Sequence, residues 1–383
     1  MLRASLRRLW LKIHRWVGLT LGPILAVTAL LGAVLVVGQP LDRQAHPELF
    51  VARTAGDATA ARLPLEPLRQ RLLAEFGPDT NLTLRPPRQP RDTYWVLVRG
   101  PWDGTVYLDP FTGAERGRRG TQEGAYSLIY KIHNSLLLDK TGKGILAFVA
   151  LAYLVLLVTG LVLWWPTRWP PSLRIVLNRG LLRGLFDLHR TGGAVLGLLI
   201  AVSVATGAYM AWRPLGDFIS AAMGQQPVKA PTIAKGAAQG PRLPLDEIVA
   251  RAQQVHPGQP IGYVVVPGKA DRPVRVRFRL PDDPHPNGIS SAWLHPVTGE
   301  VLAARKWQEL DAGNGWVAVI FPLHTGELGG VVHEIVTALL GLALGGLGFS
   351  GIWLWWRRRR TAAEAARRSA ALARPSSLSL IHI

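Results

Sequence analysis

Four of the ten histidines in this 383-residue chain occur as two regularly spaced pairs. His14 and His189 are 175 positions apart, and His133 and His324 are 191 positions apart. A neutral imidazole can donate a ring nitrogen to a metal ion, so two equivalent histidines can bind one metal from opposite sides. A lone histidine at a helix end more often makes a hydrogen bond or complements the helix dipole. The repetition of both pairs favours ligation over that structural role.

Small residues follow the first histidine of each half at helical spacing. They are Gly18 and Gly22 after His14, and Gly193 and Gly197 after His189. Because an α-helix turns by about 100° per residue, each histidine shares one face of its helix with the glycines that follow it. A glycine track below a histidine leaves room for a flat, bulky ligand. We therefore expect these glycines to form the wall of a ligand site.

The chain contains no cysteine, which excludes disulfides, thiolate metal sites, iron–sulfur clusters and the covalent attachment of c-type haem. Bare zinc or copper needs three or four protein ligands, and no carboxylate recurs in register with the histidines. Haem needs only an axial nitrogen above and below its iron, between apolar walls. The pairs therefore predict two bis-histidine b-type haems, an inner one on His14 and His189 and an outer one on His133 and His324.

Three further residues are candidates at these sites. Arg15 and Arg190 directly follow predicted ligands and could pair with haem propionates, although a role in membrane topology explains them equally well. His333 is the second choice for the outer ligand, because it begins the last apolar run. Its counterpart in the first half is Gly142, so the repeat favours His324.

Four apolar runs are long enough to cross a hydrocarbon core about 30 Å thick, which takes about 20 residues. They are Trp16–Val37, Ile145–Trp165, Gly192–Trp212 and Val331–Trp356. We predict transmembrane helices, because a helix satisfies its own backbone hydrogen bonds in lipid. A cleaved signal peptide is the alternative for the first run, but the same pattern recurs inside the chain, where it cannot be a signal.

The net charge of +19 is concentrated in three segments that flank the predicted spans. Residues 1–15, 166–190 and 357–374 carry seventeen basic residues and only two acidic ones, Asp187 and Glu364. The positive-inside rule places these segments and both termini in the cytoplasm. Membrane topology therefore accounts for the charge, which argues against nucleic-acid binding.

The two long segments between the spans also repeat. In each segment an Arg-Leu-Pro-Leu sequence, at 62–65 or 242–245, leads into an amphipathic helix, at 66–76 or 246–255. Three strand-like pieces follow, at 81–85, 93–99 and 105–108 and again at 261–266, 274–280 and 289–294, before a Pro-x-Thr-Gly turn. The predicted fold is an integral membrane, α-helical four-span bundle with two α+β outer domains. Tandem duplication gives it a pseudo-two-fold axis along the membrane normal.

The predicted organisation has eight parts. They are the N-terminus with the first span (1–38), the first outer domain (39–130), an outer segment with the second span (131–165), a cytoplasmic loop (166–188), the third span (189–212), the second outer domain (213–323), an outer segment with the fourth span (324–356) and a cytoplasmic tail (357–383). In the outer domains, the aromatic candidates for ligand contact are Trp95, Trp102, Tyr107, Trp293 and Trp307. Strand packing is the commoner role of such residues.

Five motifs resemble those of the PepSY-associated transmembrane proteins. They are His-Arg-Trp-x-Gly at 14–18, Leu-Asp-Pro-x-Thr-Gly at 108–113, Lys-Ile-His-Asn-Ser-Leu-Leu-Leu at 131–138, Leu-His-Thr-Gly at 323–326 and Gly-x-x-Leu-Trp-Trp at 351–356. Each motif alone is weak, but together they are specific. The resemblance implies PepSY-like outer domains in the periplasm and anchoring in the bacterial inner membrane. The family's histidine motifs fall on His14, His133, His189 and His324.

The length and architecture are similar to those of family members that reduce ferric siderophores. The resemblance implies a di-haem oxidoreductase that passes electrons from the cytoplasmic side to a periplasmic ferric siderophore, of the hydroxamate type, and releases Fe(II). No dinucleotide-binding motif follows a strand, so a separate donor is expected, either a quinol or a cytoplasmic reductase. The alternative is a non-enzymatic, membrane-anchored PepSY module that binds a peptide, peptidase or envelope partner. A metal permease is disfavoured by only four spans with few polar residues at their centres.

Overall fold

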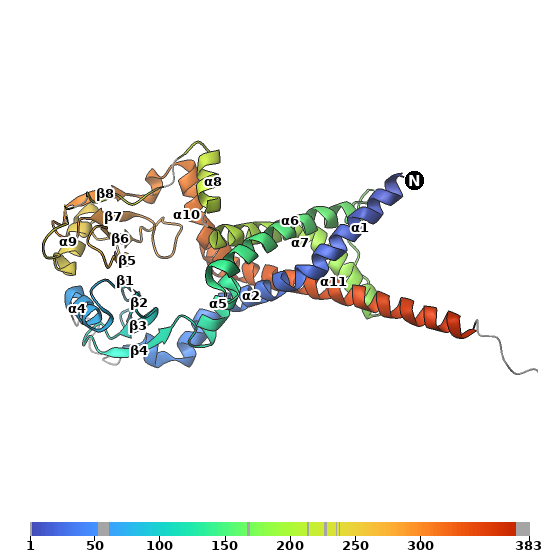
Figure 1. Ribbon diagram of the computed structural model, residues 1–383, viewed down its shortest axis with the longest axis horizontal. Coiled ribbons are helices and arrows are strands. Elements are labelled where there is room, and N and C mark those ends of the chain that lie inside the picture. The colour runs from blue at the N-terminus through green and yellow to red at the C-terminus, as the bar shows by residue number, and fades with distance from the viewer. Residues whose placement is uncertain are drawn as a thin grey trace, which may run out of the picture. The chain divides into compact units, whose positions relative to one another are not determined.

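The computed structural model describes residues 2–52, 61–166, 169–212, 214–225, 228–234, 236 and 238–372 (Figure 1). The chain divides into two compact units. The helical unit comprises Met1–Leu30, Phe148–Ala205 and Leu339–Ile383. The sheet unit comprises Leu31–Ala147 and Thr206–Ala338. Arg168, Arg374 and the tail from residue 373 lie outside the described residues.

Four helices in the described part of the chain are long and apolar enough to cross a membrane. They are α2 (Gly22–Ala45), α6 (Asp139–Trp164), α7 (Leu181–Ala211) and α11 (Gly330–Leu372). Each overlaps one of the four predicted spans, which is as expected for apolar runs that must satisfy their backbone within the helix. The four-span prediction is confirmed at this level, and the chain is a membrane protein.

The first predicted span, Trp16–Val37, is not one continuous helix. Helix α1 (Leu2–Thr20) ends just before Leu21, and α2 starts at Gly22. Pro23 lacks the backbone N–H of one intrahelical hydrogen bond, while Leu21 donates to the Val17 carbonyl at 2.9 Å and Leu25 to the Leu21 carbonyl at 3.2 Å. The interruption therefore places His14 on α1, a helix separate from the membrane-spanning α2.

The sheet unit contains one eight-stranded antiparallel sheet with the order β4-β3-β2-β1-β5-β6-β7-β8. The strands are β1 (Asn81–Arg85), β2 (Tyr94–Arg99), β3 (Gly104–Leu108), β4 (Glu115–Gly120), β5 (Ile261–Val266), β6 (Val274–Phe278), β7 (Ser291–Leu294) and β8 (Val301–Arg305). The two halves of the chain meet where β1 pairs with β5, in the register Leu82 with Val266 and Leu84 with Val264. The sequence predicts two outer domains with three strands each, whereas the structure joins four strands from each half in one sheet.

One face of the sheet is the hydrophobic core of this unit. Helices α4 (Leu65–Phe76) and α9 (Leu245–Val255) pack against it and bury the alternate strand residues (Figure 1). Leu84, Val96 and Val276, from three strands, have no exposed surface. Burying a large aliphatic side chain contributes about 1.5–3 kcal/mol, so this face anchors the unit. Side chains at the intervening positions, such as Arg85 and Trp95, lie on the opposite face.

The two helices that cover the core cap each other. The Asp246 carboxylate accepts hydrogen bonds from the backbone N–H groups of Leu65 and Glu66, at 2.7 and 2.9 Å. The Glu66 carboxylate accepts one from the N–H of Leu245 at 2.8 Å. Neither helix has a capping side chain at its own N-cap position, where each has a proline. The halves therefore satisfy each other's helix N-termini, which ties them together.

Short helices connect the sheet to the long helices. They are α3 (Pro47–Phe50), α5 (Ala125–Ser135), α8 (Pro214–Ala222), α10 (Ala312–Thr325) and the 3₁₀ turns η1 (Trp307–Glu309) and η2 (Glu327–Gly329). Helix α5 carries His133 and α10 carries His324, each close to the C-terminal end. Both helices end in left-handed residues, with φ of 50° at Leu136 and 89° at Gly326. Each histidine is thus followed by a tight turn into a long apolar helix.

Candidate functional site

The structure brings His14 and His189 together in the helical unit. Their ring centres are 6.2 Å apart, and the ring planes are nearly perpendicular at 86°. His14 comes from α1 and His189 from α7, and both side chains are half-buried. The two histidines of the predicted inner pair therefore lie next to each other in the fold, and each half of the chain contributes one of them.

Hydrogen bonds fix both imidazoles of this inner pair. His14 Nδ1 lies 2.8 Å from Thr159 Oγ1, and that hydroxyl donates its proton to the Val155 carbonyl at 2.6 Å. His14 Nδ1–H is therefore the donor to Thr159 Oγ1. His189 Nδ1 lies 3.1 Å from the Leu347 carbonyl, which can only accept, so this nitrogen also carries a proton. Both neutral rings keep a lone pair on Nε2, the arrangement that a metal-ligating histidine requires.

The second predicted pair forms in the sheet unit. The ring centres of His133 and His324 are 6.1 Å apart, with an angle of 34° between the ring planes. His324 Nδ1 lies 3.1 Å from the hydroxyl of Thr206, which is buried on α7. The outer pair, like the inner one, therefore has a hydroxyl or carbonyl oxygen beside a ring nitrogen.

A glycine lies against each of the four histidine rings. A Cβ atom on Gly32 would lie 2.8 Å from His133 Cε1, and one on Gly207 would lie 2.9 Å from His324 Cε1. The corresponding distances are 3.4 Å from Gly160 to His14 Cε1 and 3.2 Å from Gly351 to His189 Cε1. Each glycine belongs to a helix of the same half as the histidine it contacts. The absence of a side chain at these four positions is what lets the rings lie this close to the helix backbones.

The spacing of both pairs fits two imidazoles bound to one metal ion. Two imidazoles that shared one metal ion, each through a bond of about 2.0 Å, would have ring centres about 6 Å apart. The observed separations are 6.2 and 6.1 Å. No group of three or more His, Cys, Asp or Glu side chains suited to a metal ion occurs in the described part of the chain. Two nitrogens per site suit a metal whose other ligands come from a macrocycle, as in haem.

The four glycines of the predicted wall differ in their surroundings. No atom of the described residues lies within 4 Å of a Cβ placed on Gly22. The nearest atoms to Gly18 and Gly193 are leucine methyl groups at 3.7 and 3.8 Å, which is ordinary contact. Gly197 differs, because its Cβ would lie 2.6 Å from Leu157 Cδ1 and its carbonyl accepts a hydrogen bond from Tyr153. Gly22 thus adjoins open space, Gly18 and Gly193 contact leucine side chains, and Gly197 packs against α6.

The other candidate residues have structural partners or lie at the surface. Arg190 donates to the Ser172 carbonyl at 3.2 Å, and its Nε is buried without a partner among the described residues. Arg15 is exposed on α1. His333 Nδ1 accepts a hydrogen bond from the backbone N–H of Gly329 at 3.3 Å. The structure pairs His133 with His324, whereas His333 contacts the backbone at the start of its own helix.

Some neighbours of the inner histidines are not predicted by the patterns above. Thr159 and Ser350 lie beside His14 and His189, and Gly160 and Gly351 lie against the same two rings. Both sets are 191 positions apart, which is the spacing of His133 and His324. The shared spacing of 191 positions is the sequence signal for these four residues. Only the fold shows that Thr159 and Gly160 contact His14, and that Ser350 and Gly351 contact His189.

The family model of the PepSY-associated TM region matches residues 11–358, which is nearly the whole chain. No curated protein matches the chain. The matched region includes all four paired histidines, both halves of the sheet and the four apolar helices. The chain therefore belongs to the PepSY-associated TM family.

Proposed function

We propose that this membrane protein is a di-haem oxidoreductase that carries electrons from the cytoplasm to the periplasm and reduces the Fe(III) of a siderophore. The observation that supports it most directly is the spacing of the two histidine pairs, 6.2 and 6.1 Å between ring centres. In activity the protein would be similar to the ferrioxamine reductase FoxB.

The residues of the chain prepare each site for a planar, iron-containing ligand. Thr159 and the Leu347 carbonyl hold the Nδ1 protons of His14 and His189, so both Nε2 lone pairs are available. Gly22 adjoins open space, and Gly18 and Gly193 contact flexible leucine side chains. The bound b-type haems would supply one-electron iron couples in an apolar environment.

The distribution of charge supports an orientation in the inner membrane. The basic segments adjoin the end of the chain that carries His14 and the loop before His189, so these histidines belong to the cytoplasmic side. His133 and His324 precede their spans from the opposite side, which is the periplasmic one. Mirrored strand order and reciprocal helix caps further support a pseudo-two-fold relation between the halves.

The reaction that this function requires is electron transfer to Fe(III). Each Fe(III) accepts one electron, which a quinol or a cytoplasmic reductase must supply, and hard oxygen ligands hold the resulting Fe(II) far more weakly. No proton donor or nucleophile is needed for this step. The sheet unit would hold the chelate, and the histidine pairs would provide the electron path.

The test is the haem content and the reduced-minus-oxidised spectrum of the full-length protein purified with haem supplied. We expect two haems per chain with bis-histidine spectra in the wild type. His189→Ala is expected to remove the inner haem and His324→Ala the outer one. His46→Ala is the matched control, because His46 is exposed and pairs with Glu48 at 3.1 Å. A wild-type protein that binds no haem would overturn the proposal and favour a non-enzymatic module.

A further inference from the structure

The face of the sheet opposite the core is lined by arginine and aromatic side chains. Arg85 pairs with Trp95 across β1 and β2, and Arg277 pairs with Tyr263 across β5 and β6. Their strand neighbours Leu84 and Val276 are fully buried in the core, so these arginines lie on the other face. We call Arg85, Arg88, Arg275, Arg277 and Arg279 the arginine face.

Aromatic rings support several of these guanidinium groups. The Arg85 guanidinium carbon lies 3.9 Å from the centre of the Trp95 ring. Arg275 lies 4.9 Å from the Trp293 ring, and Arg277 lies 5.8 Å from the Tyr263 ring. Stacking on an aromatic face holds a guanidinium in place and leaves its N–H edge directed away from the ring. These arginines are therefore pre-positioned.

The arginine face has no carboxylate partners of its own. None of its five members forms an ion pair within the described residues. Arg275 and Arg277 donate to neutral acceptors instead, the Ser291 hydroxyl at 3.0 Å and the Gly288 carbonyl at 2.8 Å. The Nε of Arg279 is buried without any hydrogen-bond partner in the part of the chain that the structure describes.

Three acids lie near the arginine face, and each also accepts hydrogen bonds from other groups. Glu327, which is close enough to act on Arg85 and Arg88, accepts the Thr325 hydroxyl at 3.0 Å. Asp92 pairs with Arg43 at 2.7 Å and accepts backbone N–H groups at 88 and 89. Asp283 accepts the backbone N–H groups of His285 and Ile289, at 3.0 and 2.6 Å. Four arginines of this face are half-buried and Arg88 is exposed, so a negatively charged ligand can reach them and supply the counter-charge.

The positive potential of this face is visible at His285. Burial, followed by Arg277, Arg88 and Arg275, lowers the pKa of His285 to about 3. Its Nδ1 accepts the backbone N–H of Asn287 at 3.0 Å, which a protonated nitrogen could not do. Burial and the neighbouring Arg277 also lower the pKa of Arg275, to about 10.

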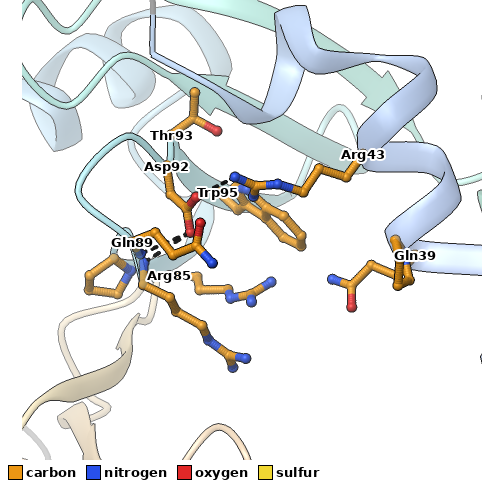
Figure 2. Close-up of a pocket in the computed structure, with 10 residues that line it drawn as sticks. Gln39, Arg43, Arg85, Gln89, Asp92, Thr93 and Trp95 are labelled. Atoms are coloured by element: carbon orange, nitrogen blue, oxygen red, sulfur yellow. Dashed lines mark hydrogen bonds and ion pairs between the residues drawn. The ribbon is translucent and has the colours of Figure 1, made fainter. Parts of the chain in front are cut away.

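A cavity opens at one end of the arginine face. Its volume is about 250 Å³, and its lining includes Arg85, Arg88 and Trp95. Figure 2 shows Asp92 at its wall, joined to Arg43 by the ion pair that neutralises both. Arg85 and Arg88 are the lining arginines that have no such partner among the described residues. The cavity thus offers space beside guanidinium groups that lack a counter-ion.

We propose that the arginine face binds a ferric chelate whose ligands are carboxylates and whose net charge is negative. The inference rests on the proposed function and specifies its substrate class, in place of a neutral or cationic hydroxamate chelate. Guanidinium groups pair with carboxylates through two parallel hydrogen bonds, and several carboxylates on one chelate match several arginines on one face. Attraction between opposite charges also draws the chelate to the site and weakens as salt rises.

The test is calorimetric binding of gallium(III) citrate to the full-length protein in detergent. Gallium(III) has the charge of Fe(III) but is not reduced, so binding is measured apart from electron transfer. We expect Arg85→Gln and Arg277→Gln each to weaken binding at least tenfold, because each variant loses one charge-assisted hydrogen-bonded pair with the chelate. Arg85→Lys is expected to retain only part of the wild-type affinity, because lysine lacks the planar guanidinium group that forms two parallel hydrogen bonds.

Arg251→Gln is the matched control. It removes the same charge from α9, on the core side of the sheet, where Arg251 pairs with Glu247 at 2.6 Å. Binding of gallium(III) citrate should be unchanged in this variant and also in His189→Ala. Equal binding by wild type and both arginine-face variants, or preference for a neutral gallium trihydroxamate, would overturn the inference. Absence of haem with intact citrate binding would instead refute the proposed function alone.

Discussion

Adding one methyl group at Gly32 is expected to displace His133 and disturb the proposed outer haem site. The new Cβ would lie 2.8 Å from His133 Cε1, whereas carbon atoms in good contact are about 3.5–4.0 Å apart. The ring must therefore move by about 0.7 Å or the helices must separate. Since His133 lies 6.1 Å from His324 between ring centres, such a shift breaks the trans-imidazole spacing.

The energetic effect has two opposing parts. Overpacking of a filled site costs about 1–3 kcal/mol. Replacing glycine by alanine inside a helix contributes about 1 kcal/mol of stability, which offsets part of that cost. Gly144→Ala isolates the second part, because no atom of the described residues lies within 4 Å of its Cβ. The difference between the two variants is then about 1–3 kcal/mol and measures the clash with His133.

Haem stoichiometry, the reduced-minus-oxidised spectrum and thermal unfolding of each purified variant test this reasoning. Gly32→Ala and Gly207→Ala are expected to lower the haem content at the outer site and the unfolding temperature. Gly160→Ala should do less at the inner site, since its Cβ would be 3.4 Å from His14. A Gly32→Ala protein with the same spectrum and stability as Gly144→Ala would show that the close contact does not position the ring.

Three further predictions concern the wall, the arginine face and the helix caps. Gly18→Leu and Gly193→Leu each add a large side chain one helical turn from an inner histidine, so the haem content should fall by one per chain. Unchanged haem content would rule out these glycines as the wall. The pKa of His285 is lowered to about 3 by burial and then by neighbouring arginines, so only the unfolded state binds its proton between about pH 6.5 and 3. Stability should therefore be complete above pH 6.5 and fall by about 1–2 kcal/mol by pH 5, a loss that His285→Gln should reduce in thermal unfolding at both pH values. Asp246→Ala leaves two helix N–H groups without a cap and should lower the stability of the sheet unit by about 1 kcal/mol in denaturant unfolding, whereas Asp271→Ala, at an exposed loop position, should have little effect.

The membrane helices and the inner strands could be predicted because their sequence patterns have few alternatives. An apolar run of span length has only one common structure in lipid, and β1, β2, β5 and β6 alternate between buried and exposed residues. Strand β4 reads Glu-Arg-Gly-Arg-Arg-Gly and has no such alternation, so its pairing with β3 depends on tertiary context. The interruption at Leu21 is local, and Pro23 is its sequence signal.

The union of the two sheets could not be predicted, because nothing in β1 or β5 alone specifies its partner. Their backbone edges are complementary to any strand, and the reciprocal caps of Asp246 and Glu66, which join the same two halves, are visible only in the fold. The arginine face could not be predicted from the sequence for a related reason. Arg85 and Arg277 occupy alternate strand positions that a sequence pattern assigns to solvent, and only the register places them beside Trp95 and Tyr263.

The contacts of the four histidines divide into two kinds, and this division explains the duplication. Contacts within one half position each ring, as Gly160 does for His14 and Gly32 for His133. Contacts between halves bring the ring centres to 6.2 and 6.1 Å from each other. One half therefore contains the means to orient both of its histidines but supplies only one ligand to each site. A two-ligand site requires two such halves, and fusing them in one chain ensures that the inner and outer pairs form together.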